Sequence, residues 1–144
     1  MKKYKIGYTQ GVYDMFHIGH LNLINKAKEQ CERLIVGVNS DRLVEEYKHK
    51  RTVVDERDRA EIVRNIKAVD ECIVVDTLDK LVTMKQLHFD AIFIGSDWYG
   101  NARWIETSKI LSKFGVDVVF LPHTEGISST DLRTKTNKQV DETL

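Results

Sequence analysis

Two histidines near the start of the chain, His17 and His20, combine a versatile side chain with an informative spacing. They lie three residues apart at the expected start of a helix, so both rings face the same side. Such a pair can hold zinc, can pack as ordinary structural side chains, or can donate hydrogen bonds to phosphate oxygens. Which of these uses applies depends on the elements that position the pair.

Zinc has the weakest support of the three. A catalytic zinc site takes three protein ligands. The other histidines, His49, His88 and His123, show no ligand spacing with the pair, and neither Cys31 nor Cys72 lies near it. The two cysteines are far apart and form no CxxC motif, which is typical of reduced thiols in a cytoplasmic protein.

The composition is that of an ordinary globular protein, and it disfavours several classes. The 144 residues suggest a single domain with a sizeable core. Lysine plus arginine and aspartate plus glutamate both total 22, so the formal net charge is zero, which argues against a nucleic-acid partner. No apolar run approaches the roughly 18 residues of a membrane span. The N-terminus lacks the long apolar stretch of a secretory signal.

Five apolar runs alternate with five helical patterns. Nearly continuous Val, Ile, Leu and Phe, as in the later four runs, is typical of strands covered on both faces in a parallel sheet. The expected strands are residues 4–10, 33–39, 71–76, 90–95 and 116–122. The expected helices are residues 19–30, a segment capped by Ser40, residues 55–69, residues 78–87 with Thr77 as a possible cap, and residues 101–114 followed by Gly115.

This alternation predicts an α/β fold, a Rossmann-like, doubly wound, five-stranded parallel sheet with helices on both faces. We expect one domain over residues 1–135 and a frayed polar tail over residues 136–144. Ligands of such sheets bind outside the carboxyl ends of the strands. The histidine pair follows the first strand, where a helix N-terminus also offers unpaired N–H groups to anions. Its position therefore favours phosphate over zinc or simple packing.

The loop that carries the histidines is not one of the common nucleotide motifs. It contains Gly11 and Gly19, but neither GxGxxG nor the Gly-Lys-Ser/Thr ending of a P-loop. Asp41, after the second strand, could bind a ribose. Without the glycine fingerprint, however, an NAD-dependent oxidoreductase is only a remote alternative.

Three other stretches could serve phosphate or nucleotide, and each has a plainer explanation. The stretch "GISSTDLR" (126–133) places three hydroxyls at a helix start, where they could bind anions or only cap the helix. The run "KHKR" (48–51) could reach phosphate or form a solvated charged face. Trp98 and Trp104 could stack on a base or anchor the core and loops. The residues alone leave these alternatives open.

Together, four stretches resemble the HxGH nucleotidyltransferases, and within them the small cytidylyltransferases. "GVYDMFHIGH" (11–20) resembles their first signature and "HTEGISSTDLR" (123–133) their second. "GSDWYG" (95–100) resembles a stretch of the glycerol-3-phosphate cytidylyltransferases, and "ERDRAEIVRNIKAVDECI" (56–73) resembles the arginine helix of the family. The similarity spans about residues 4–133, and two separated signatures in the right order make it specific.

The resemblance implies a role for each matching residue. Those expected to act on the reacting phosphates are His17, His20, Lys48, Lys50 and Arg59. Those expected to bind the nucleotide are Thr9, Gly11, Asp14, Gly19, Gly95, Asp97, Trp98, Thr124, Gly126, Ile127, Ser128, Ser129 and Thr130. Asp14 would hold Mg²⁺ or shape its loop, and Lys67 and His123 would contact the acceptor. Both Lys67 and His123 stand where the family has arginine. These two departures affect the identity of the acceptor or the affinity for the triphosphate.

The implied reaction transfers CMP from CTP to a small phosphorylated alcohol, with sn-glycerol 3-phosphate as the first choice, and it uses Mg²⁺ or another divalent cation. Pyrophosphate and a CDP-alcohol are the expected products. The alternatives are another acceptor, such as phosphocholine or a sugar phosphate, or ATP as the donor. A non-catalytic nucleotide-binding module is the alternative from another class. The resemblance also implies a homodimer, whereas the cytoplasmic location and the lack of a nucleic-acid partner are expected from the cysteines and the zero net charge.

Overall fold

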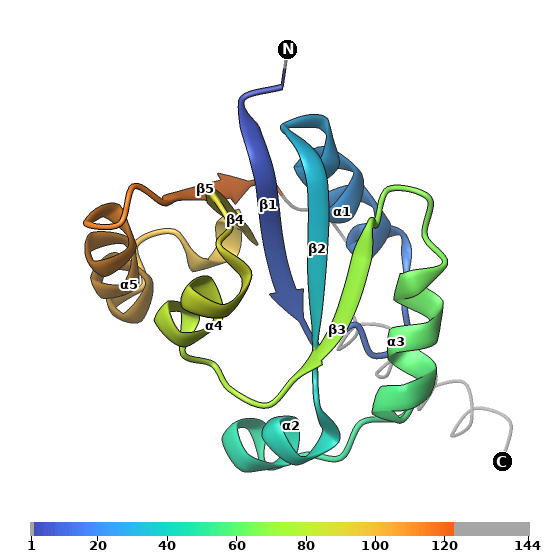
Figure 1. Cartoon of the computed structure of the whole chain (residues 1–144). Coiled ribbons are helices and arrows are strands. Elements are labelled where there is room, and N and C mark those ends of the chain that lie inside the picture. The colour runs from blue at the N-terminus through green and yellow to red at the C-terminus, as the bar shows by residue number, and fades with distance from the viewer. Residues whose placement is uncertain (1, 123–144) are drawn as a thin grey trace, which may run out of the picture.

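The computed structural model describes residues 2–122 of the chain as one sheet flanked by helices (Figure 1). In chain order the elements are β1 (Tyr4–Gly11), α1 (Ile18–Glu29), β2 (Cys31–Asn39), α2 (Asp41–Lys48), α3 (Glu56–Arg64), β3 (Glu71–Val75), α4 (Lys80–Leu87), β4 (Ala91–Gly95), the 3₁₀ turn η1 (Ser96–Trp98), α5 (Ala102–Ser112) and β5 (Asp117–Leu121). All five predicted strands are therefore present.

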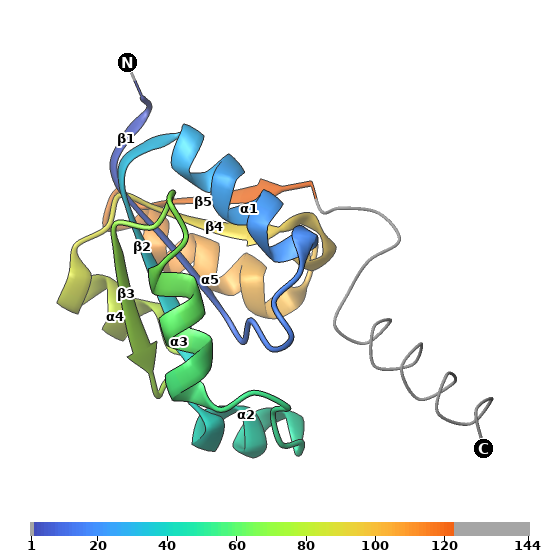
Figure 2. The ribbon, with the colours of Figure 1, turned by 90° about the vertical axis from the view of Figure 1, so that its right-hand side faces the viewer.

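The sheet is parallel throughout, with strand order β3-β2-β1-β4-β5. This order confirms the predicted doubly wound, Rossmann-like α/β fold. Helices α1 and α3 cover one face, and α4 and α5 cover the other (Figures 1 and 2). The strand order reverses between β1 and β4, so the carboxyl ends of these two strands form the crevice in which such folds bind ligands.

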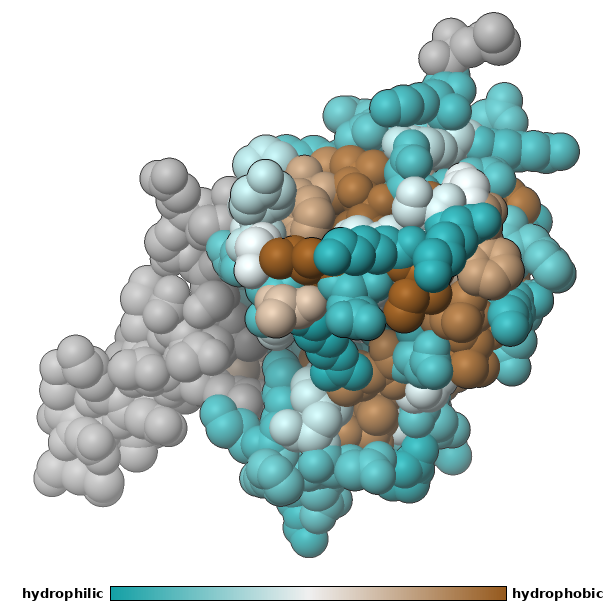
Figure 3. Space-filling model, turned by 90° about the vertical axis from the view of Figure 1, so that its left-hand side faces the viewer, coloured by the Kyte–Doolittle hydropathy of each residue, from teal (hydrophilic) through white to brown (hydrophobic). Residues whose placement is uncertain are grey.

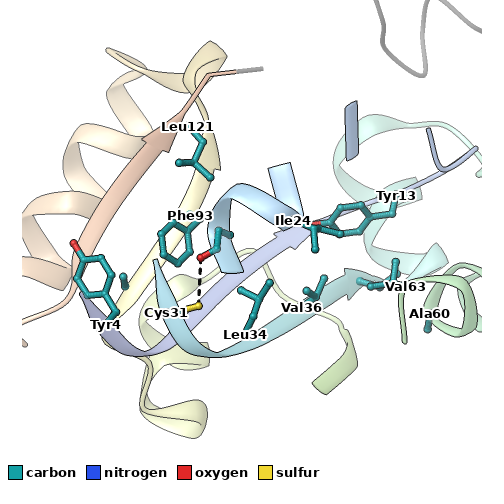
Figure 4. Packing of buried hydrophobic residues seen from close by; sticks show 13 residues of the cluster. Tyr4, Tyr13, Ile24, Cys31, Leu34, Val36, Ala60, Val63, Phe93 and Leu121 are labelled. Atoms are coloured by element: carbon teal, nitrogen blue, oxygen red, sulfur yellow. Dashed lines mark hydrogen bonds between the residues drawn. The ribbon is translucent and has the colours of Figure 1, made fainter. Parts of the chain in front are cut away.

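Two cores sandwich the sheet. On the α1 and α3 side, Ile24 and Val63 pack against Leu34 and Val36 of β2 (Figure 4). On the other side, the ring of Tyr8 stacks on Phe89 with centroids 4.8 Å apart.

Gly37 of β2 makes room for the ring of Tyr8. A Cβ atom at Gly37 would lie 2.2 Å from the Tyr8 hydroxyl, so any larger residue there would displace the tyrosine. These packed layers hold the carboxyl edge of the sheet in place.

Most helix boundaries follow the predictions. Ser40 caps α2 by accepting a hydrogen bond from the Leu43 N–H (3.1 Å), and Gly115 adopts a φ of 74° just after α5. The third helix is shorter than predicted, because it ends at Arg64 and the chain continues in tight turns with i→i−3 hydrogen bonds. The prediction overran because Ile66 and Val69 still pack on the core and so prolong the apolar pattern.

The cap of α4 was assigned to the wrong residue. Asp79, not Thr77, caps this helix, and its carboxylate accepts from the N–H groups of Leu81 and Val82. Thr77 lies two residues before Asp79, and its hydroxyl accepts from the Asp79 N–H (3.0 Å). Within residues 2–122 no helix is both long and apolar enough to cross a membrane.

Candidate active site

The histidine pair lies where the loop after β1 enters α1. His17 is the N-cap of α1, and its Nδ1 accepts from the Gly19 N–H at 3.0 Å. His20, in the first turn, returns the contact, because its Nδ1 accepts from the His17 N–H at 3.2 Å. The two rings stack with centroids 3.8 Å apart and planes 24° apart. The imidazoles thus form a capping box, the reciprocal arrangement that Ser and Glu usually make.

These hydrogen bonds assign the same tautomer to both rings. A ring nitrogen that accepts carries no proton, so each neutral imidazole bears its proton on Nε2. The rings are neutral at physiological pH, because burial lowers the pKa of His17 below its usual value. Burial, with a smaller contribution from His17, lowers the pKa of His20 to about 4. The pair therefore offers two Nε2–H donors.

The Nε2–H of His17 has no use in the fold itself. This atom is buried, yet it has no hydrogen-bond partner among the residues that the structure describes. A buried polar group without a partner costs free energy, so native proteins seldom retain one without a reason. A ligand that accepts hydrogen bonds, such as a phosphate oxygen, would satisfy it.

Asp14 holds the loop in shape. The buried carboxylate of Asp14 accepts from the N–H groups of Val53 (2.8 Å) and Val54 (2.9 Å), which ties the first loop to the segment before α3. On either side, Tyr13 and Met15 adopt positive φ angles of 55° and 52°. Non-glycine residues adopt such angles only where the surroundings impose them.

The two roles expected of Asp14 are therefore not equally supported. The hydrogen bonds show the loop-shaping role directly. The same bonds engage both carboxylate oxygens of Asp14, which are the atoms that would bind a metal ion. Residues 2–122 contain no cluster of three or more His, Cys, Asp or Glu side chains that could hold a metal ion. The described side chains do not fit a metal ion held by the protein alone.

Arg59 departs from its predicted role as a phosphate ligand. It is 1% exposed, and its guanidinium donates to the carbonyls of Val12, Asn39 and Val54 at 2.7–2.8 Å. Its remaining nitrogen pairs with the carboxylate of Asp41 at 2.5 Å. Because Arg59 is buried and four of its five N–H groups are engaged in this way, it positions the loops around the site.

Thr9 is also turned away from any ligand. Its side chain is 1% exposed, and its hydroxyl donates to the Phe93 carbonyl (2.9 Å), which joins β1 to β4. Gly11 lies against the ring of Tyr13, since a Cβ atom there would come within 3.1 Å of the ring. Gly19 opens α1, where its N–H binds His17. The two glycines thus shape the loop.

The loop after β4 reaches the same edge of the sheet. Gly95 ends β4, which neighbours β1, and Asp97 and Trp98 follow in η1 with exposed side chains. The ring of Trp98 is 51% exposed, so it does not anchor the core. These residues are placed where a nucleotide at the crevice could contact them.

The three candidate lysines lie in two different regions. Lys48 ends α2 and Lys50 follows it, both with exposed side chains near the carboxyl edge. Lys67 instead lies between α3 and β3, at the amino end of the strand. Within one chain this is the edge opposite the histidines, because parallel strands end together. The structure therefore separates Lys67 from an acceptor bound at the carboxyl edge.

Seven predicted site residues lie outside the described part of the chain. They are His123, Thr124, Gly126, Ile127, Ser128, Ser129 and Thr130.

A series of side-chain hydrogen bonds at the strand ends was not predicted from the sequence. The Gln10 amide donates to Asn39 (2.8 Å) and to the Thr77 carbonyl (3.0 Å), so it links the ends of β1 and β2 with the loop after β3. The Asn39 amide donates in turn to the hydroxyl of Tyr47 (3.1 Å). Polar residues at or next to the last position of buried strands, Gln10 and Asn39, were the signal that could have revealed these hydrogen bonds.

Comparison with known proteins decides the family. The sequence profile described as "Cytidylyltransferase-like" matches residues 8–135, most of the chain. The chain belongs to the cytidylyltransferase-like family. It is similar to the bifunctional protein HldE of Hyphomonas neptunium (34% identity) and of Caulobacter vibrioides (32%), over 93% and 92% of this chain. It spans only 28% and 27% of the length of these relatives.

Solved structures agree on the fold. A lipopolysaccharide core biosynthesis protein from Thermoplasma volcanium superposes with a TM-score of 0.70 at 24% identity, over 84% of this chain and 97% of that one. Pantothenate synthetase from Thermus thermophilus superposes with a TM-score of 0.65 at 16% identity, over 96% and 66%. Membership of this family supports the predicted enzyme class, a nucleotidyltransferase.

Proposed function

We propose that this cytidylyltransferase-like chain transfers a nucleoside monophosphate from a nucleoside triphosphate to the phosphate of a small acceptor and releases pyrophosphate. The observation that carries the proposal is the stacked histidine pair at the N-terminus of α1. It presents two neutral Nε2–H donors, one of them buried and without a partner in residues 2–122. The pair follows the carboxyl end of β1, where this fold has its ligand-binding crevice.

In the proposed reaction, an oxygen of the acceptor phosphate attacks the α-phosphorus of the triphosphate. The bond from that phosphorus to the bridging oxygen breaks, and pyrophosphate leaves with the electron pair. An ionised phosphate needs no general base, which suits two histidines that are neutral and act as donors. His17 and His20 would donate to the α-phosphate oxygens, where negative charge builds up in the transition state.

Lowering the barrier as far as enzymes do requires more groups than the two histidines. One well-placed donor contributes about 3–4 kcal/mol, whereas enzymes lower barriers by about 8–23 kcal/mol. We propose that Lys48 or Lys50 supplies further positive charge from the segment after α2. We also propose that Thr124 and Ser128–Thr130 hold the β- and γ-phosphates. Any divalent cation would enter on the triphosphate oxygens, as Mg²⁺ commonly does.

For the substrates, CTP and glycerol 3-phosphate are the first pair to test. The cytidylyltransferase-like family supports the donor, and the resemblance of "GSDWYG" supports the acceptor. A second candidate acceptor is a sugar phosphate, with CTP or ATP as donor. It is favoured by the structural neighbour that is named for lipopolysaccharide core biosynthesis, and by His123, which stands where the second family signature has arginine.

The deciding experiment incubates the chain with Mg²⁺, each of the four nucleoside triphosphates, and a panel of phosphorylated acceptors, and follows pyrophosphate. The panel contains glycerol 3-phosphate, phosphocholine and several sugar phosphates. Release that needs both a triphosphate and an acceptor is the expected result. If triphosphate binds but no pairing releases pyrophosphate, the chain is a binding module and the proposal fails. If only ATP reacts, the cytidine assignment fails.

A further inference from the structure

A cavity of about 420 Å³ opens between the loop after β3 and helix α5, outside the site described above. Its walls include Thr77, Leu78 and Asp79 from the loop, Lys80 from the start of α4, and Arg103 and Thr107 from α5. It lies on the α4 and α5 side of the sheet, the side that Figure 3 views and where hydrophobic and hydrophilic surface alternate.

Two cations share this cavity. The ammonium of Lys80 donates to the Leu78 carbonyl (2.9 Å) and lies 5.6 Å from the centre of the Trp104 ring. Within residues 2–122 neither Lys80 nor Arg103 forms an ion pair with a carboxylate. The nearby carboxylate of Asp79 is engaged in capping α4. The cavity wall therefore carries two cations against one carboxylate, which leaves an excess of positive charge.

This arrangement of charges is electrostatically unfavourable. Burial, together with the repulsion from Arg103, lowers the pKa of Lys80 to about 8. A buried charge is costly unless it is paired, and two like charges that face one another add to that cost. An anion placed between the two side chains would remove both penalties, and arginine binds phosphate oxygens well because its N–H groups form a rigid fork.

The cavity is connected to the loop of the histidines. Gln10, one residue before the end of β1, donates to the Thr77 carbonyl in the cavity wall. His17 and His20 follow the same strand on the α1 side of the sheet, whereas the cavity lies on the other side. In an in-line displacement the entering and leaving groups lie on opposite sides of the phosphorus. If the triphosphate is bound over the N-terminus of α1, the acceptor phosphate can therefore approach the α-phosphorus from the cavity side.

A second cavity, of about 510 Å³, lies between α2 and the start of α3 and suits a phosphate less well. Its walls carry the carboxyl groups of Asp41, Glu45, Asp55 and Asp58 against the single cation Arg51. That surplus of negative charge would repel a phosphorylated compound. Of the two cavities, only the first has the charge that an anionic acceptor requires.

We propose that Lys80 and Arg103 bind the phosphate of the acceptor in the cavity between the loop after β3 and α5. This inference rests on the proposed function, and it names the side chains that select an anionic acceptor. It replaces Lys67 in that role, because Lys67 lies at the opposite edge of the sheet. The ligand class is a phosphate monoester, held by one arginine fork and one ammonium group.

The kinetic test compares Arg103→Gln with Lys109→Gln, a substitution of another exposed cation of α5 that lies outside the cavity wall. Arg103→Gln should raise KM for the active acceptor by about tenfold or more, the loss expected for one charge-assisted hydrogen bond. KM for the triphosphate should stay within about twofold in both variants. An unchanged acceptor KM in Arg103→Gln would overturn the proposal.

A binding test works even if the transferase assay fails. Inorganic phosphate, and separately glycerol 3-phosphate, are titrated into ¹⁵N-labelled protein without nucleotide. The amide signals of Thr77 to Leu81 and of Arg103 should shift, and this response should weaken in Arg103→Gln and in Lys80→Met but persist in Lys109→Gln. Shifts absent from these amides, or unaffected by Arg103→Gln, would refute the cavity as a phosphate site. A shift without turnover would refute only the proposed reaction.

Discussion

At the scale of single residues, His17 and His20 each use one ring nitrogen in the fold and keep the other for the site that we propose. One nitrogen of each ring accepts a hydrogen bond in the first turn of α1, and the Nε2 of His17 is buried without a partner among residues 2–122. Because the capping nitrogen must accept, capping fixes the tautomer that makes Nε2 the donor. The capping contacts confirm a structural use of the pair, and they leave it compatible with the phosphate-binding role that we propose.

His20 should make the protein sensitive to acid. Its pKa is about 4 in the folded chain, against an ordinary value of 6.5, because burial disfavours the charged ring. As the pH falls from 6.5 towards 4, the unfolded chain therefore takes up a proton that the folded chain does not. The free energy of unfolding should decrease over that interval by roughly 2–3 kcal/mol from this residue.

Urea unfolding of wild type and His20→Gln at pH 7 and pH 4.5 measures this contribution. Glutamine does not titrate, so the variant should lose less stability on acidification than wild type. His88→Gln, at an exposed position, is the control and should behave like wild type. Identical acid losses in wild type and His20→Gln would show that His20 is not held neutral.

At the scale of elements, Arg59 joins the parts that form the site. One guanidinium fastens the loop after β1, the end of β2, the start of α2 and the segment before α3. Replacing it by methionine would remove the guanidinium donors of three carbonyls and the ion pair of the Asp41 carboxylate, which would still accept from Thr52 and the Glu56 N–H. We expect Arg59→Met to lower the free energy of unfolding by roughly 3–5 kcal/mol.

The matched control for Arg59→Met is Arg64→Met, which removes an exposed ion pair with Glu61 on the same helix. It should cost no more than about 1 kcal/mol. Both values come from urea denaturation at neutral pH. If Arg59→Met were as stable as wild type but bound triphosphate poorly, Arg59 would be a phosphate ligand after all.

The sequence predicted the elements better than the uses of its charged side chains. Continuous apolar runs identify parallel strands because both faces of such strands are covered, and all five were found. A buried arginine and a phosphate-binding arginine look alike in a sequence, so the role of Arg59 could not be predicted. Lys80 and Arg103 belong to no motif, and only the packing of α4 beside α5 brings them together.

At the scale of the whole molecule, the sheet separates two groups of donors. The histidines lie on the α1 side, and the Lys80 and Arg103 cavity lies on the α4 and α5 side. Such a division suits a single displacement in which one group enters as another leaves. No protein nucleophile is needed, so each turnover should invert the configuration at the α-phosphorus.

A triphosphate with one α-oxygen replaced by sulfur, used as a single stereoisomer, tests this expectation. The product should have inverted configuration at phosphorus, as read by ³¹P NMR after comparison with standards. Retention would indicate two successive displacements and a covalent intermediate on the protein.

The most direct test of the histidine pair is kcat for pyrophosphate release by His17→Asn at saturating substrates. Asparagine is among the best N-cap residues, so α1 should stay capped and the melting temperature should stay close to that of wild type. The side chain is too short to place a donor where Nε2 lies, so kcat should fall by roughly 10²–10³-fold. A variant with unchanged kcat would contradict the proposal that His17 stabilises the transition state.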